Sequence, residues 1–184
     1  MASMDPTRLS HELRQGQSPD LTRRRWVLGL SLLSAAMGQV VALYQMGLVK
    51  RLPDPPGRLR RVFDATKVDA SDYAYKRLNM PDAPMMITTY GVTAMLASAG
   101  GEARARDVPW LPIALAAKTL YDSATALRLG QEEWRDNRAL CEYCQVATVA
   151  SLASLALALP EAVRATRHLL GRDDGNGART PAPA

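Results

Sequence analysis

The stretch RALCEYCQVATVASLASLALALPEA, residues 138–162, decides how the chain is interpreted. It holds the only two cysteines of the 184-residue sequence, Cys141 and Cys144. An uncharged run follows them from Gln145 to Pro160. About 20 predominantly apolar residues are enough to cross the hydrocarbon core of a membrane. The stretch therefore predicts a membrane-spanning helix, about residues 139–159, with a dithiol at its start.

Three further apolar segments precede this one, at about residues 26–49, 84–101 and 110–129. A cleaved signal sequence is the alternative interpretation of the first segment, because arginines precede it and Ser34-Ala35-Ala36 resembles a cleavage site. The uncharged run continues well past that point, whereas the apolar region of a signal is usually about 7–15 residues long. We therefore expect a retained helix.

The third segment carries two charges, Lys118 and Asp122. Their i, i+4 spacing lets them pair on one face of a helix, which lowers the cost of placing them in a membrane. Trp26, Trp110 and Trp134 each lie at or just before the start of an apolar segment, as in the aromatic belts of membrane interfaces. Both patterns support four helices.

The predicted fold is all-α: a four-helix transmembrane bundle over residues 26–160, with a long polar loop, residues 50–83, between helices 1 and 2. We expect residues 1–25 to form a disordered cytoplasmic tail and residues 161–184 a polar C-terminal tail. A short amphipathic helix is expected in the loop, near residues 69–72.

Charge gives a partial guide to orientation and partners. Lys and Arg are balanced between the two predicted sides, but the triplet Arg23-Arg24-Arg25 directly before the first helix favours a cytoplasmic N-terminus. We expect an integral protein of the bacterial inner membrane, with both termini cytoplasmic and the cysteines on the oxidising side. The net charge of +5 and the pI of about 9.5 come from scattered basic residues, so a nucleic-acid partner is not expected.

Cys-x-x-Cys places two sulfurs within bonding reach across one helical turn. At a helix N-terminus the free amides and the dipole lower the pKa of a thiol, with Arg138 acting in the same direction and Glu142 against it. A haem attachment site is excluded because Gln145 stands where His is needed, and no metal is expected because His11 and His168 lie far away. Two inert packing thiols remain the alternative to a redox-active pair.

One face of the last helix carries Cys141, Cys144, Gln145, Thr148 and Ser151 at i, i+3, i+4, i+7 spacing. Because this face is small and polar, we expect it to face the bundle interior. A dithiol beside an apolar cavity near the membrane surface suits a lipid-soluble two-electron carrier, and a quinone is the predicted substrate.

Four apolar helices with LCEYCQVATVASL at the start of the fourth, and a first loop ending in NMPDAP, resemble the vitamin K epoxide reductase family. The resemblance covers about residues 26–160 and implies a four-helix bundle around a quinone. It implies that Cys144 reacts with the quinone and that Cys141 exchanges with an outside thiol. Asp82 stands where the family often has an Asn that binds a quinone carbonyl, so Asp82, Thr148 and Gln145 are the predicted quinone-binding residues.

The sequence also departs from that family. Family members typically carry a second cysteine pair in the first loop, whereas residues 50–83 contain none, and we expect no fused thioredoxin-like domain. An external thioredoxin-like thiol protein would then attack Cys141 directly, with the loop as a cap. The predicted function is a membrane-embedded thiol–quinone oxidoreductase. The alternative is a redox-inactive bundle that binds quinone or lipid, or serves as a subunit of a complex.

Overall fold

The computed structural model describes residues 5–56, 59 and 62–171. Within these residues the chain is helical, and the only β-type pairing is an isolated bridge between Phe63 and Leu140. The prediction of an all-α fold is therefore confirmed.

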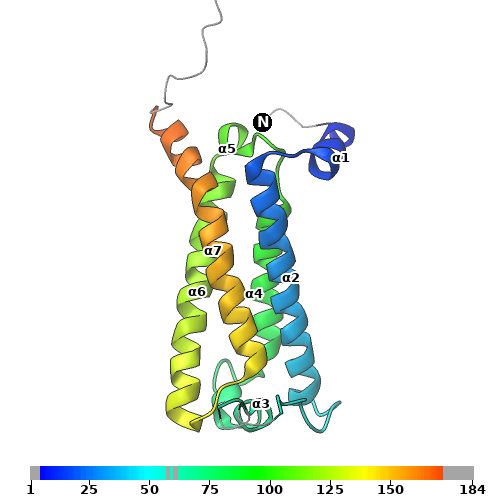
Figure 1. The fold of residues 1–184 in the computed structure, drawn as a ribbon, viewed down its shortest axis with the longest axis vertical. Helices are drawn as coiled ribbons and strands as arrows, with labels where there is room; N and C mark the ends of the chain where they lie inside the picture. Colours follow the sequence, from blue (N-terminus) through cyan, green and yellow to red (C-terminus); the bar gives the residue numbers. More distant parts are fainter. Residues whose placement is uncertain (1–4, 57–58, 60–61, 172–184) are drawn as a thin grey trace, which may run out of the picture.

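Four long helices run side by side along the length of the molecule (Figure 1). Helix α2 packs against α4 and α7, while α6 packs mainly against α7. Short helices lie at the two ends. The elements in chain order are α1 (Pro6–Gln15), α2 (Pro19–Gln45), α3 (Ala65–Asp69), the 3₁₀ helix η2 (Asp72–Ala74), α4 (Asp82–Ser98), α5 (Arg104–Asp107), α6 (Trp110–Asn137) and α7 (Glu142–Leu169).

The N-terminal segment differs from the predicted disordered tail of residues 1–25. It forms α1 and the first turns of α2, and only residues 1–4 lie outside the described part. Asp5 caps α1 by accepting a hydrogen bond from the Thr7 amide, and Ser18 caps α2 by accepting one from the Leu21 amide. In both helices a proline occupies the first turn, where its missing N–H costs nothing.

Helices α6 and α7 are also longer than predicted. Residues 130–137, which lie between the predicted third and fourth helices, continue α6 to Asn137, and Arg138 ends it with a left-handed backbone at φ 51°. Helix α7 starts at Glu142 and runs through Pro160 to Leu169. Residues 161–169 of the predicted C-terminal tail are thus helical, while residues 172–184 lie outside the described part.

The bundle interior is rich in small residues and contains many hydroxyl side chains, and large apolar side chains lie on much of its outside. Buried hydroxyl residues line the helix contacts, among them Ser34, Thr93 and Ser154. Large apolar side chains are exposed on all four long helices, including Leu33, Val92, Met95, Leu120 and Val149. Soluble proteins show the reverse arrangement, whereas helices packed in lipid bury small residues against each other.

Close helix approach depends on one glycine in particular. At Gly38 in α2, an added Cβ would lie 3.1 Å from Cγ1 of Ile87 and 3.3 Å from Cγ of Met86, both in α4. Helices α2 and α4 therefore approach more closely here than a larger residue would allow.

Within the part of the chain that the structure describes, two helices, α2 and α7, are long and apolar enough to cross a membrane by length and composition. The prediction of four spanning helices is thus not confirmed by this criterion. Helix α4 has only 17 residues, and α6 carries Lys118 and Asp122 within its apolar half.

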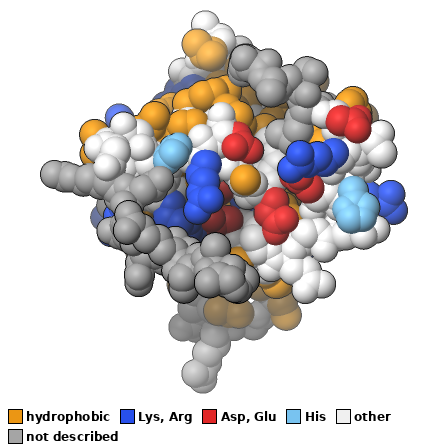
Figure 2. Space-filling view, turned by 90° about the horizontal axis from the view of Figure 1, so that it is seen from above, with side chains coloured by type: hydrophobic (Ala, Val, Ile, Leu, Met, Phe, Trp, Pro, Cys, Tyr) orange, Lys and Arg blue, Asp and Glu red, His pale blue; other side chains and the backbone are white. Residues whose placement is uncertain are grey.

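The end of the molecule that carries α1 and α5 is charged (Figure 2). Two buried arginines satisfy the last carbonyls of α4 and its following turn there. Arg24 donates to the carbonyls of Ala97, Ala99, Gly100 and Gly101, each at 2.9 Å. Arg104 donates to Leu96 and Ala99 at 2.7 Å and forms two 2.8 Å bonds with Glu161 of α7. One arginine of the predicted orientation triplet is therefore a buried helix cap.

The predicted pairing of Lys118 with Asp122 is confirmed. The two side chains form an ion pair within α6, and Asp122 is 5% exposed. Helix α4 completes the site: Thr93 donates to Asp122 at 2.7 Å, and the Lys118 ammonium donates to the Thr89 carbonyl at 3.0 Å. The pair thus links α6 to α4.

We expect Asp122→Leu alone to destabilise the protein by about 3 kcal/mol, because it leaves a half-buried ammonium without its counter-ion. The double variant Lys118→Met/Asp122→Leu should lose less, since no unpaired charge remains. Chemical unfolding in detergent micelles measures both. The exposed variant Arg128→Ala, which breaks an i, i+4 pair with Glu132, is the control and should cost well under about 1 kcal/mol. A double variant less stable than the single one would contradict the pairing argument.

Candidate functional site

The start of α7 is held by hydrogen bonds to the polar loop and to α6. The Leu140 amide donates to the Val62 carbonyl at 2.8 Å, and the Asp64 amide donates to the Leu140 carbonyl at 3.0 Å. The Cys141 amide donates to Oε2 of Glu133 in α6 at 3.2 Å. Polar loop, α6 and α7 therefore meet at the first cysteine.

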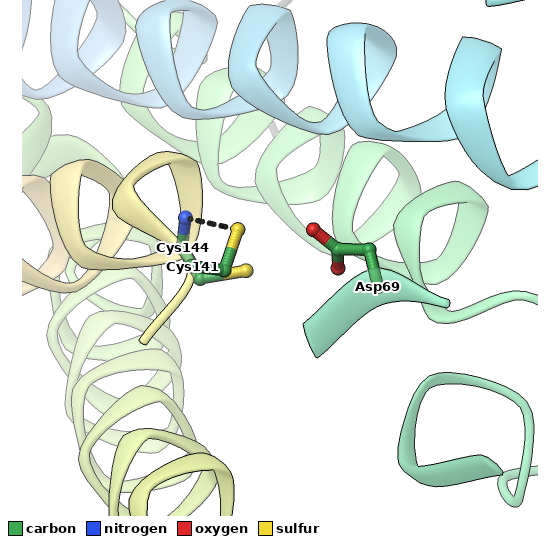
Figure 3. A group of neighbouring side chains, drawn as sticks. All are labelled: Asp69, Cys141 and Cys144. Carbon is green, nitrogen blue, oxygen red and sulfur yellow. Dashed lines mark hydrogen bonds between the residues drawn. The ribbon is translucent and has the colours of Figure 1, made fainter. Parts of the chain in front are cut away.

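Cys141 is the N-cap residue of α7. Its Sγ accepts a hydrogen bond from the Cys144 amide at 3.4 Å, in the role that a Ser or Asp oxygen usually fills. Both cysteines are free thiols. The carboxylate of Asp69, at the end of α3, points toward the two sulfurs, and the three ligand-type atoms lie within 4.8 Å of one another (Figure 3).

The two sulfurs differ in their surroundings. Cys144 is half-buried and lines a cavity of about 250 Å³, whereas Cys141 is completely buried beneath α3 and does not line it. The predicted direct attack of an outside thiol on Cys141 requires an accessible sulfur, whereas the loop covers this one. Burial of Cys141 follows from the loop, which packs Ala65 and Val68 into the same apolar cluster.

The cavity lies among α2, α4, α6, α7 and the polar loop, with a mainly apolar wall. Of the predicted quinone-binding residues, Asp82 and Thr148 line it. Gln145 does not; its amide lies 3.4 Å from Oε2 of Glu133. Their binding roles stay predictions. The full lining is Val41, Tyr73, Arg77, Asp82, Ala83, Met85, Met86, Thr89, Tyr90, Tyr121, Asp122, Thr125, Ala126, Leu129, Glu133, Cys144, Ala147 and Thr148.

Several polar side chains of the site were not found from the sequence. The Tyr90 hydroxyl lies 2.8 Å from the Ser151 hydroxyl, and the Tyr73 hydroxyl donates to the Leu129 carbonyl at 3.0 Å. The Arg77 guanidinium lies over the Tyr73 ring, 4.8 Å from its centre. These residues come from the loop and α4, and no spacing relates them to the cysteines.

Electrostatics around the dithiol oppose ionisation. Burial raises the pKa of Asp69 to about 8, and its Oδ2 is buried without a hydrogen-bond partner. The side-chain contact with Cys144 lowers the pKa of Cys141, but burial and the charge of Asp69 outweigh it and raise the value to about 11. The sequence-based expectation of a lowered pKa at the helix N-terminus is therefore wrong for Cys141.

The same groups could offer ligands to a metal ion, since two thiols and a carboxylate gather here. A structural zinc site needs four ligands. The next carboxylate, that of Glu133, already accepts bonds from the Cys141 amide and Gln145. The geometry favours chemistry between the two thiols.

The sequence model of the vitamin K epoxide reductase family matches residues 25–159. None of the curated proteins gives a significant match to the chain. The matched range covers the four long helices up to the middle of α7, the cavity and both cysteines.

The different surroundings of the two sulfurs predict different labelling rates. Cys141→Ser, which leaves Cys144 at the cavity, should react with N-ethylmaleimide at least about tenfold faster than Cys144→Ser, which leaves the buried Cys141, because the reagent can reach only a thiol that lines the cavity. The rates are measured by quenching the labelling reaction at pH 7 at successive times and counting the label by mass spectrometry. Both variants should label equally after denaturation in SDS. Faster labelling of Cys141 in the folded protein would contradict the placement.

Proposed function

The chain belongs to the vitamin K epoxide reductase family, and from that premise we propose that it is a membrane-embedded thiol–quinone oxidoreductase. Membership implies an oxidoreductase that acts on thiols and a quinone in a membrane. The proposal adds that Cys141 and Cys144 form the working dithiol.

One observation carries the proposal: a cysteine sulfur stands in the wall of an apolar cavity, with a second sulfur directly behind it. At about 250 Å³ the cavity lies just below the ~300 Å³ of the smaller small-molecule sites. That size suits a quinone ring with its isoprenoid tail in the lipid. The hydroxyls of Tyr90 and Thr148 line the same space and offer hydrogen bonds to ring oxygens.

The proposed reaction uses the sulfurs in order. Cys144 reacts with the quinone ring, and Cys141 then attacks the Cys144 sulfur to close the disulfide. Two S–H bonds are lost and one S–S bond forms, while the quinone gains two electrons and two protons as hydroquinone. Since Cys141 has no cavity contact, its part is to complete the disulfide.

Renewal of the dithiol requires an outside thiol. Residues 50–83 contain no cysteine, so we propose direct reduction by an external thioredoxin-like thiol protein. The loop is the cap that this partner must displace. It is held down by hydrogen bonds from Tyr44 to the Thr66 carbonyl at 3.1 Å and from Tyr143 to the Pro53 carbonyl at 3.0 Å.

We further propose that all four long helices span a membrane. Their exposed apolar side chains, described above, support lipid contact on α4 and α6 as well as on α2 and α7. Trp26 and Trp110 are exposed near the end that carries α5, and Trp134 is exposed near the opposite end, as two interfacial belts require. Both described ends of the chain lie away from the cysteines (Figure 1), which fits cytoplasmic termini and a dithiol on the oxidising side of a bacterial inner membrane.

A redox-inactive bundle that binds quinone or lipid, or serves as a subunit of a complex, is the second candidate. The specific observation in its favour is the burial of Cys141 in a chain that has no loop cysteine to relay electrons.

Serine substitution separates the two candidates. Purified protein reduced with dithiothreitol should form hydroquinone from a soluble naphthoquinone. The double variant Cys141→Ser/Cys144→Ser should still bind the quinone but should not reduce it. Absorbance follows the reaction, and calorimetry measures the binding. Wild-type protein that binds the quinone without reducing it would favour the redox-inactive bundle.

Orientation is tested with single cysteines on the Cys141→Ser/Cys144→Ser background. Leu78→Cys, in the loop, and Leu170→Cys, after α7, replace side chains that are 81% and 64% exposed. In right-side-out spheroplasts a membrane-impermeant maleimide should label the first variant directly and the second only after permeabilisation. The reverse pattern would show that the proposed orientation is inverted. Labelling of both variants without permeabilisation would place positions 78 and 170 on the same side, and would contradict the proposal that three helices cross the membrane between them.

A further inference from the structure

We propose that Asp69 is the proton acceptor for Cys141, so that the polar loop contributes a carboxylate to the dithiol reaction. This inference rests on the proposed function and adds a catalytic residue that lies far from the cysteines in sequence. It starts from the position of the carboxylate, which points at both sulfurs (Figure 3).

The Asp69 carboxylate is buried, and one of its oxygens has no hydrogen bond to compensate for the burial. Asp69 is only 2% exposed, and its Oδ2 makes no hydrogen bond. A buried carboxylate normally has hydrogen-bond partners, because leaving one unpaired is costly. The ligand-type atoms of Asp69, Cys141 and Cys144 lie within 4.8 Å of one another, so the two thiols are within close reach of this carboxylate.

Helix α3 holds the Asp69 side chain in its position. It is the last residue of α3, whose first turn is capped by Asp64 through a 2.9 Å bond to the Lys67 amide. The neighbouring Val68 is 1% exposed and packs in the cluster that contains Cys141. Helix α3 therefore fixes the carboxylate against the sulfur with little freedom to turn toward solvent.

Burial, together with the nearby carboxylates, favours the protonated form of Asp69 at neutral pH. Burial is the main cause of its raised pKa, near 8, and nearby carboxylates add to it. An acceptor with a pKa near the working pH is well suited to both taking and releasing a proton. The ionisable groups that interact with it come from the loop and from α4, α6 and α7: Tyr75, Asp82, Glu133, Cys141, Glu142, Tyr143 and Cys144.

The proposed step couples loss of the Cys141 proton to formation of the disulfide. Cys141 loses its proton to an Asp69 oxygen as its sulfur attacks Cys144, and the S–S bond forms while the bond from Cys144 to its oxidant breaks. The electron pair of that broken bond leaves with the oxidant, which for the proposed reaction is the quinone. The Asp69 proton then passes toward the cavity, where the Glu133 carboxylate lines the wall, and on to a hydroquinone oxygen.

Disulfide closure with Ellman's reagent tests this step without any quinone. The reagent first forms a mixed disulfide at Cys144, and Cys141 then expels the second chromophore. In the wild type the closure rate should rise with pH to about 8, where Asp69 becomes an anion, and then level off. Asp69→Asn should slow closure about 100-fold at pH 7, and its rate should continue to rise above pH 8.

Two internal controls accompany the measurement. The first chromophore should appear at the same rate in Asp69→Asn, which shows that the fold and access to Cys144 are intact. Asp64→Asn removes a carboxylate from the same helix but keeps a capping side chain, and both of its phases should match the wild type. Asp69→Glu should recover part of the closure rate.

Closure by Asp69→Asn at the wild-type rate, or with the wild-type pH profile, would overturn the proposal. So would equal slowing of both phases, because that indicates a structural defect. A normal closure profile in a protein that does not reduce quinone would instead support Asp69 and contradict the proposed function, so the two failures are distinguishable.

Discussion

The start of α7 is the constraint on which the site depends. At Leu140 and Cys141 the backbone is bonded to the polar loop on one side and to Glu133 of α6 on the other. The Cys141 sulfur caps the helix it begins, so it is fixed relative to Cys144. One sulfur therefore faces the cavity and the other is held beneath α3. This division gives two chemically similar thiols different parts in one reaction.

The loop is as important to this arrangement as the long helices. Phe63 and Asp64 pair with Leu140, and α3 then turns Asp69 toward the sulfurs. At the opposite end, Arg24 and Arg104 close the turn after α4 with buried guanidinium groups. At both ends of the bundle, side chains thus form hydrogen bonds with backbone groups that helix ends leave unpaired. In the middle, the helices are held by contacts between small residues and by the Lys118–Asp122 pair. The arrangement suits an environment in which water does not satisfy polar groups.

Features encoded in local spacing could be predicted from the sequence. The Cys-x-x-Cys at a helix start, the i, i+4 pair of Lys118 and Asp122 and the long apolar segments all follow from neighbours along one helix. Asp82 and Thr148, predicted to bind the quinone, line the same cavity as Cys144, and their binding roles stay predictions. Asp69 and Glu133 could not be found in this way, because tertiary packing brings them to the cysteines from separate elements. The pKa of Cys141 was misjudged for the same reason: the helix dipole is visible in sequence, whereas burial and the charge of Asp69 are not.

The central claim is that the two cysteines act as one two-electron donor to a quinone in the adjoining cavity. An anaerobic titration of fully reduced protein with a soluble naphthoquinone, with free thiols counted after acid quenching, tests it most directly. We expect one equivalent of quinone to yield one equivalent of hydroquinone, with both thiols lost together and an intramolecular Cys141–Cys144 disulfide found by mass spectrometry. Hydroquinone formation with both thiols still free, or no loss of thiols at any quinone concentration, would contradict the account.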